Sequence, residues 1–177
     1  RPARTAPTSR SERPTATDTT FGEMPVSATS HELSITRHID APVSDVWDVL
    51  ANRQEEWWCP RPWRVEVDEQ DKRPGGVCRM TMYGPEGEVA PQNGIYLAYD
   101  EGRRFITTDA VTGDFQPSGP FMIGIWEVEP EGSGTRYTAR ARHWNAETMQ
   151  QHADMGFEQG WSACADQLAE ICEGKAP

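Results

Sequence analysis

Four side chains of this sequence could take part in proton transfer: His143, Asp109, Tyr96 and Tyr137. An imidazole beside a carboxylate or a phenol can act as a general acid or base and move a proton during a reaction. His143 has the same parity as Tyr137 along one predicted strand, so both side chains are expected to face the same side of a sheet. A histidine at the end of a strand can equally serve as a hydrogen-bonded rim residue. The sequence therefore assigns no catalytic residue and leaves open whether the protein is an enzyme.

The remaining histidines and the cysteines match no metal or cofactor motif. His31, His38 and His152 have no carboxylate or cysteine at ligand spacing. The four cysteines, at positions 59, 78, 164 and 172, fit neither a zinc nor a redox pattern. The sequence also lacks a phosphate loop, a dinucleotide fingerprint and a Gly-x-Ser-x-Gly nucleophile elbow. We therefore expect no metal, no cofactor, and reduced thiols in a cytoplasmic protein.

The charge and hydropathy of the chain argue against two kinds of partner. Its 28 acidic and 17 basic residues give a formal charge of −11 and a pI near 4.8. Such a surface repels nucleic-acid phosphates and anionic lipid headgroups. The sequence also has no apolar run of about 18 residues, the length that a transmembrane helix needs. Neither a nucleic acid nor a membrane is expected to be a partner.

The element best placed to organise these side chains is a long amphipathic helix predicted over residues 145–172. Apolar and small residues recur there at the spacing of three and four that marks one helix face, namely Met149, Ala153, Phe157, Gly160, Trp161, Cys164, Leu168 and Ile171. Asn145 and Gly174 stand where an N-cap and a C′ glycine are expected, and Gln167 is placed on the water-facing side. Gly156 and Gly160 each cost about 1 kcal/mol in a helix interior. Close packing or room for a ligand must offset that cost.

The segments before this helix predict the sheet that it packs against. A strand over residues 31–40 is followed by a helix over 41–52 and a helical turn within 53–63, where Trp57 or Trp58 meets the core. Turn signals then separate six strand-length runs, over 63–69, 77–83, 88–100, 103–111, 121–130 and 135–144. Short connections make the sheet antiparallel. We therefore predict an α+β fold, with a curved antiparallel sheet of six or seven strands, two short helices after the first strand, and the long helix at the end.

A curved sheet that holds a long helix leaves a wedge-shaped space between the two. The residues predicted to line this wedge as a ligand-binding site are Trp58, Met80, Met82, Trp126, Tyr137, Phe157 and Trp161. Methionine and aromatic side chains are common in pockets for small molecules, but they are equally the material of an ordinary core. Residues 1–30 are rich in Thr, Ser, Pro and Arg, which favours a flexible extension ahead of a domain over residues 31–174.

Several segments together resemble the SRPBCC superfamily and, within it, the AHSA-type branch related to the C-terminal domain of the heat-shock chaperone ATPase activator. They are ITRHIDAPVSDVWDVLAN at 35–52, the Trp57–Trp58 pair, KRPGG at 72–76, GPEG at 84–87, NGIY at 93–96, GRRFITTDAV at 102–111, GTRYTA at 134–139 and GFEQGWSACADQLAE at 156–170. The resemblance implies a START-like helix-grip fold with a cavity between sheet and terminal helix, and a link to the stress response.

The resemblance leaves three classes of function open, because this superfamily carries many activities. The first is binding of a small hydrophobic or aromatic ligand in the cavity. The second is a cavity enzyme of the polyketide-cyclase or hydrolase kind, and the third is a module that stimulates a chaperone ATPase, with a chaperone or a second copy of the chain as partner. We favour binding, because the predicted wedge is rich in Met and aromatic residues and poor in paired ionisable groups.

Overall fold

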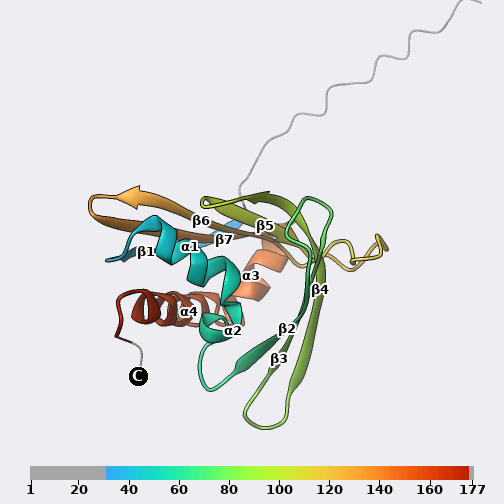
Figure 1. The fold of residues 1–177 in the computed structure, drawn as a ribbon. Helices are drawn as coiled ribbons and strands as arrows, with labels where there is room; N and C mark the ends of the chain where they lie inside the picture. Colours follow the sequence, from blue (N-terminus) through green and yellow to red (C-terminus); the bar gives the residue numbers. More distant parts are fainter. Residues whose placement is uncertain (1–30, 176–177) are drawn as a thin grey trace, which may run out of the picture.

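The structure, a computed structural model, describes residues 31–175, which form one antiparallel sheet and four helices (Figure 1). The predicted flexible extension over residues 1–30 lies outside the described residues. In chain order the elements are β1 (Glu32–Ile39), α1 (Val43–Asn52), α2 (Gln54–Trp57), β2 (Arg64–Gln70), β3 (Val77–Tyr83), β4 (Val89–Asp100), β5 (Arg104–Thr108), β6 (Ile123–Glu131), β7 (Gly134–Arg142), α3 (Ala146–Asp154) and α4 (Phe157–Cys172).

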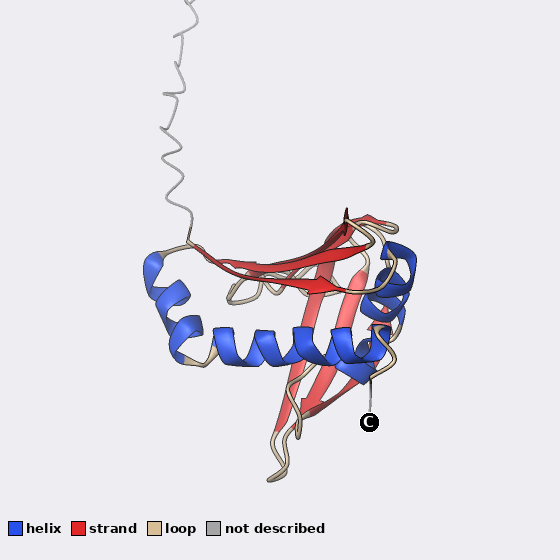
Figure 2. Cartoon of the chain, turned by 90° about the vertical axis from the view of Figure 1, so that its left-hand side faces the viewer, coloured by secondary structure: helices blue, strands red, loops and turns tan. Residues whose placement is uncertain are grey.

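The seven strands pair in the order β1-β7-β6-β5-β4-β3-β2, so the first two strands of the chain are the two edges of the sheet. The sheet is strongly bent: β1, β7 and β6 lie over α4, while β2, β3 and β4 run down past the side of that helix (Figures 1 and 2). The pairing register shifts between Tyr96 and Ala98 on β4, and between Val67 and Glu69 on β2. Such bulges increase local twist and bending. This confirms the predicted helix-grip arrangement.

The helices after β1 form where the sequence predicts them. Pro42 stands at the N-cap of α1. The apolar side chains of this helix, Val46, Trp47 and Leu50, are buried against the sheet and α4. The indole nitrogen of Trp47 donates to a Glu101 carboxylate oxygen at 2.8 Å. Of the tryptophan pair, Trp57 is completely buried, as expected for at least one of the two.

The prediction of a single terminal helix over residues 145–172 is wrong, because the chain forms two helices there, α3 and α4. Asn145 caps α3 as predicted, accepting the Thr148 backbone N–H at 2.8 Å. The chain then turns at Met155 and Gly156, where Gly156 has φ 91°, a left-handed conformation that glycine adopts without steric cost. From there α4 runs in a new direction across the concave face of the sheet (Figure 2). Gly156 therefore ends one helix and begins another, rather than weakening the middle of one.

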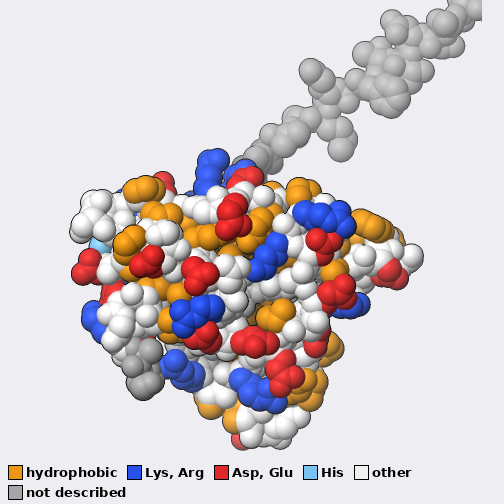
Figure 3. All heavy atoms as spheres, in the orientation of Figure 1, with side chains coloured by type: hydrophobic (Ala, Val, Ile, Leu, Met, Phe, Trp, Pro, Cys, Tyr) orange, Lys and Arg blue, Asp and Glu red, His pale blue; other side chains and the backbone are white. Residues whose placement is uncertain are grey.

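Acidic and basic side chains are interspersed on the face seen in Figure 3, which shows no patch of one sign. Many form ion pairs between neighbouring strands, such as Arg142 with Glu32 at 2.6 Å and Arg104 with Asp100 within the β4–β5 hairpin, also at 2.6 Å. Among the helices of residues 31–175, none combines the length and the apolar character needed to cross a lipid bilayer.

Candidate ligand-binding cavity

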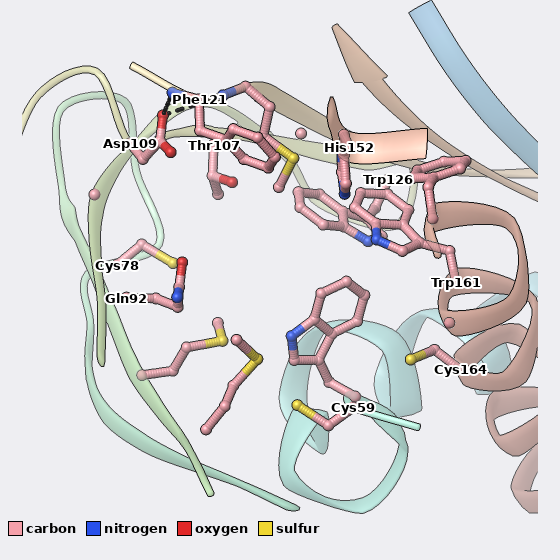
Figure 4. A pocket seen from close by; sticks show the side chains of 18 of the residues that line it. Cys59, Cys78, Gln92, Thr107, Asp109, Phe121, Trp126, His152, Trp161 and Cys164 are labelled. Atoms are coloured by element: carbon pink, nitrogen blue, oxygen red, sulfur yellow. Dashed lines mark hydrogen bonds between the residues drawn. The ribbon is translucent and has the colours of Figure 1, made fainter. Parts of the chain in front are cut away.

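A cavity of about 410 Å³ lies between the concave face of the sheet and α4 (Figure 4). Strands β3 to β6 form one wall, and the segment after α2 together with α4 forms the other. Met155, at the turn between α3 and α4, lines the cavity and is 70% exposed, so the cavity reaches solvent there. Its apolar and sulfur-bearing lining consists of Trp58, Cys59, Pro60, Cys78, Met80, Met82, Phe105, Phe121, Met122, Trp126, Met155, Phe157, Trp161 and Cys164. Its size falls in the usual range of small-molecule sites, about 300–1,000 Å³.

Three tryptophans from three parts of the chain meet in the wall of this cavity. The rings of Trp126 on β6 and Trp161 on α4 stack at a centroid distance of 5.6 Å and an interplanar angle of 14°. Trp58 meets both rings edge-on, at 5.8 Å from Trp126 and 5.4 Å from Trp161. Offset stacks and edge-to-face pairs are the favoured aromatic geometries. We call these residues, Trp58, Trp126 and Trp161, the tryptophan triad.

Gln167 holds the backbone that carries Trp58. Its amide nitrogen donates to the carbonyl oxygens of Trp57 and Cys59, at 2.7 and 2.8 Å, and its amide oxygen accepts the Arg61 backbone N–H at 2.9 Å. The prediction that Gln167 faces water is therefore wrong, since its side chain is buried with all three bonds made inside the protein. Cys59 has φ 71°, a left-handed conformation that is unfavourable for a non-glycine residue. The Gln167 bonds on either side of it stabilise this turn.

Sulfur atoms make up much of the remaining wall. Cys78, Met80 and Met82 alternate along β3 and so face the cavity from one side, while Cys59 and Cys164 face it from the other (Figure 4). Burial raises the pKa of the Cys59 thiol to about 11 and that of Cys164 to about 12. Both thiols are protonated at neutral pH and are therefore poor nucleophiles. This wall offers polarisable contact surface rather than reactive groups.

Two histidines form a buried pair at one end of the cavity. The Nε2 atom of His143, just after β7, lies 2.9 Å from Nδ1 of His152 on α3, and both side chains are buried. The His152 ring lines the cavity and contacts three aromatic rings, at centroid distances of 4.8 Å to Phe121, 5.0 Å to Phe157 and 5.8 Å to Trp161. Burial lowers the pKa of both histidines, that of His152 to about 4 with a further contribution from His143. Both rings are neutral at pH 7.

Asp109 also lines the cavity, but its carboxylate is used to hold a loop. One carboxylate oxygen accepts the backbone N–H groups of Phe121 and Met122, at 2.8 and 3.2 Å (Figure 4). These bonds fasten the end of the long β5–β6 connection and set Phe121 beside His152. Among residues 31–175, Asp109 is the only formally ionised side chain that lines the cavity, and no lysine or arginine does so.

Two glycines shape the cavity in different ways. A β-carbon added at Gly124 on β6 would lie 2.3 Å from a ring carbon of Trp126, so the absence of a side chain there lets the indole lie flat over the strand. A β-carbon added at Gly160 on α4 would meet only Pro60, at 4.0 Å. Gly160 therefore leaves empty space instead of permitting close packing.

Six of the seven predicted site residues line the cavity: Trp58, Met80, Met82, Trp126, Phe157 and Trp161. The seventh, Tyr137, faces the concave side as its parity predicts, but it is 1% exposed and packs beneath Trp57 at a ring distance of 6.4 Å, in the core rather than the cavity wall. Tyr96 is likewise a core residue, and burial raises its pKa.

Sequence reasoning missed His152, Phe121 and the amide Gln92 as lining residues. A signal for His152 was present, because it follows Met149 by three residues and so lies next to the apolar helix face. Among residues 31–175, no group of three or more His, Cys, Asp or Glu side chains is arranged to hold a metal ion.

The comparisons with known proteins agree with this architecture. Residues 40–173 match the family described as Activator of Hsp90 ATPase homolog 1-like protein. A crystal structure of a protein from Nitrosomonas europaea is 34% identical and superposes with a TM-score of 0.76, covering 81% of this chain and 95% of that one. A crystal structure of a protein from Mycobacterium smegmatis is 32% identical with a TM-score of 0.67, covering 79% and 89%.

A third solved structure, from Arthrobacter aurescens, is 26% identical with a TM-score of 0.70, covering 81% of this chain and 86% of that one. A search of curated proteins gave no match. Because the family match spans most of the described residues and is joined by two relatives above 30% identity, the chain belongs to the family of Activator of Hsp90 ATPase homolog 1-like proteins, within the SRPBCC superfamily.

Proposed function

We propose that this protein binds a small hydrophobic or aromatic molecule in the cavity between its sheet and α4. The observation that carries the proposal is the tryptophan triad in the wall of a cavity of about 410 Å³. A core that only had to be stable would close this space, because interiors pack to high density and unfilled volume costs stability. The lining is largely aromatic and sulfur-bearing, and an apolar ring would gain contact on several sides.

The chemistry of the lining favours binding over turnover. One carboxylate oxygen of Asp109 already accepts two backbone N–H groups. The thiols of Cys59 and Cys164 are protonated, and His152 is neutral because its pKa is low. A general acid–base catalyst works best with a pKa near the working pH. These features support a carrier or sensor role over that of a cyclase or hydrolase.

The test is a titration with the neutral fluorescent probe N-phenyl-1-naphthylamine, comparing Trp161→Ala with Trp47→Ala. Both residues are large and buried, but Trp161 borders the cavity while Trp47 packs in the core against Phe105 and Tyr99. We expect Trp161→Ala to abolish the fluorescence increase and Trp47→Ala to keep it. Trp47→Ala should cost about 3–5 kcal/mol of stability, and Trp161→Ala less. A wild-type protein that gives no probe response would contradict the proposal.

Stimulation of a chaperone ATPase is the second candidate, and the family match favours it. It is tested by measuring the ATPase rate of a purified Hsp90-type chaperone with and without this protein. A rate increase that persists in Trp161→Ala would place that activity on the outer surface, independent of the cavity.

A further inference from the structure

The hydrogen bonds of the histidine pair fix where its protons lie. Nδ1 of His143 is 3.3 Å from the backbone carbonyl oxygen of His31, and a carbonyl oxygen can only accept. Nδ1 of neutral His143 therefore carries the proton and Nε2 carries the lone pair. That lone pair faces Nδ1 of His152 at 2.9 Å, so His152 must donate through its own Nδ1–H. Each ring dictates the tautomer of the next.

The consequence is a free hydrogen-bond acceptor where this row of hydrogen bonds, from the His31 carbonyl through His143 to His152, reaches the cavity. With its proton on Nδ1, neutral His152 presents a lone pair on Nε2, and Figure 4 shows its ring reaching into the cavity from the α3 side. Within residues 31–175 this nitrogen has no hydrogen-bond partner, although the side chain is 93% buried in a cage of Phe121, Phe157 and Trp161. The nitrogen borders the cavity, so a ligand with a donor group can reach it.

Trp161 supplies aromatic surface beside this acceptor, since its ring contacts that of His152 at a centroid distance of 5.8 Å. The indole Nε1–H of Trp126 also lacks an acceptor among the described residues, but it is fully buried and does not border the cavity. An aromatic ring in the cavity beside Trp161 would lie near the unpaired nitrogen of His152.

The charge of the lining limits what that ring can carry. Within the described part of the chain no lysine or arginine lines the cavity, and the one carboxylate that does, Asp109, repels anions. Burial and His143 keep His152 neutral, with a pKa of about 4. A carboxylate or phenolate would thus enter without a counter-charge and could not donate to His152.

We propose that the ligand is a neutral hydroxylated aromatic compound, whose O–H donates to Nε2 of His152. This inference rests on the proposed binding function and specifies the chemical class of its ligand. The His31 carbonyl and His143 act as positioning groups that hold the acceptor of His152 toward the cavity.

Three probes of one shape test the assignment by isothermal titration calorimetry at pH 7: 2-naphthol, 2-methoxynaphthalene and 2-methylnaphthalene. The first has a donor and an acceptor, the second only an acceptor, and the third neither. The variant His152→Asn keeps an amide where Nδ1 stood, within reach of His143, and removes the atom at Nε2. We expect His152→Asn to raise the Kd of 2-naphthol about tenfold or more and to leave the Kd of the other two probes within about twofold of the wild-type value. His152→Gln, whose amide reaches the Nε2 position, should restore part of the loss.

In the wild-type protein, ¹⁵N NMR of the imidazoles gives a readout that requires no variant: both histidines should show protonated Nδ1, and 2-naphthol alone should shift Nε2 of His152.

The outcomes separate the two proposals. If all three probes bind and His152→Asn weakens them equally, or if Nε2 of His152 does not respond to 2-naphthol, the hydroxyl assignment is wrong and the binding function stands. If none of the probes binds, the binding function itself fails.

Discussion

Replacing two glycines of the same cavity by alanine should have opposite effects on stability. Gly160→Ala adds a methyl group that meets only Pro60 at 4.0 Å, so no atom has to move. It also removes a glycine from α4, which is worth up to about 1 kcal/mol in a helix. We expect Gly160→Ala to raise the free energy of unfolding by about 0.5–1 kcal/mol.

Gly124→Ala adds the same methyl group where Trp126 already lies. The new carbon would be 2.3 Å from one atom of the indole and 2.5 Å from another. That indole is held between Phe105, at 5.1 Å, and Trp161, at 5.6 Å, and it cannot move without disturbing both stacks. Overpacking of this kind costs about 1–3 kcal/mol. The free energies of unfolding of the two variants should therefore differ by about 1.5–4 kcal/mol although their composition is identical.

Urea unfolding followed by far-UV circular dichroism measures this difference, with unchanged m-values as the check that the unfolded state is unaltered. Thermal unfolding gives a second reading, at about 2–4 °C per kcal/mol for a chain of this size. If Gly160→Ala lowers the free energy of unfolding by 1 kcal/mol or more, the empty space inferred beside Gly160 does not exist. Helix α4 would then have to pack directly on the sheet at that point.

Three further outcomes follow from the same structure. Gln167→Leu should lower the free energy of unfolding by about 2–4 kcal/mol in urea, because it leaves three backbone groups without partners, two of them buried, and a loss below 0.5 kcal/mol would contradict a stabilising role for Gln167. The free energy of unfolding should fall by about 2–3 kcal/mol as pH drops from 6.5 towards 4, because burial and, to a smaller extent, His143 hold the pKa of folded His152 at about 4, whereas unfolded His152 gains a proton below its ordinary pKa. His152→Asn should lack this part of the pH dependence. Thiol labelling at pH 8 should reach Cys172 first, because the other three cysteines are buried, and denaturation should release four thiols.

Much of the fold could be predicted because each strand carries its own local pattern. Alternation in Val77–Tyr83 and the turn signals around it placed β3 within its observed bounds. The break between α3 and α4 could not be read in this way. The apolar spacing continues from Ala153 to Phe157 across the break, so periodicity alone describes one helix. Only the left-handed conformation at Gly156 ends it, and a glycine in a sequence does not reveal its φ.

The parts of the site that escaped prediction depend on contacts between distant segments. Gln167 appears polar and therefore exposed until the turn at Cys59 is known to lie over it. The His143–His152 pair exists because the chain turns between β7 and α3, which brings the two rings together from different elements. Tyr137 was given the correct face of the sheet, but parity does not indicate where along that face the cavity ends and the core begins.

The order of the strands also governs when the cavity can form during folding. The edge strand β1 has no partner until β7 exists, since Ile35 pairs with Ala139. Helix α4, which follows β7, supplies Trp161 and packs against both β1 and α1. Pairings of such high sequence separation have a large loop-closure entropy and slow the folding of a domain. On a ribosome, β3 to β6, which form the apolar wall of the cavity, are therefore synthesised before the helix that covers them. During that interval the wall is a surface on which a general chaperone could act.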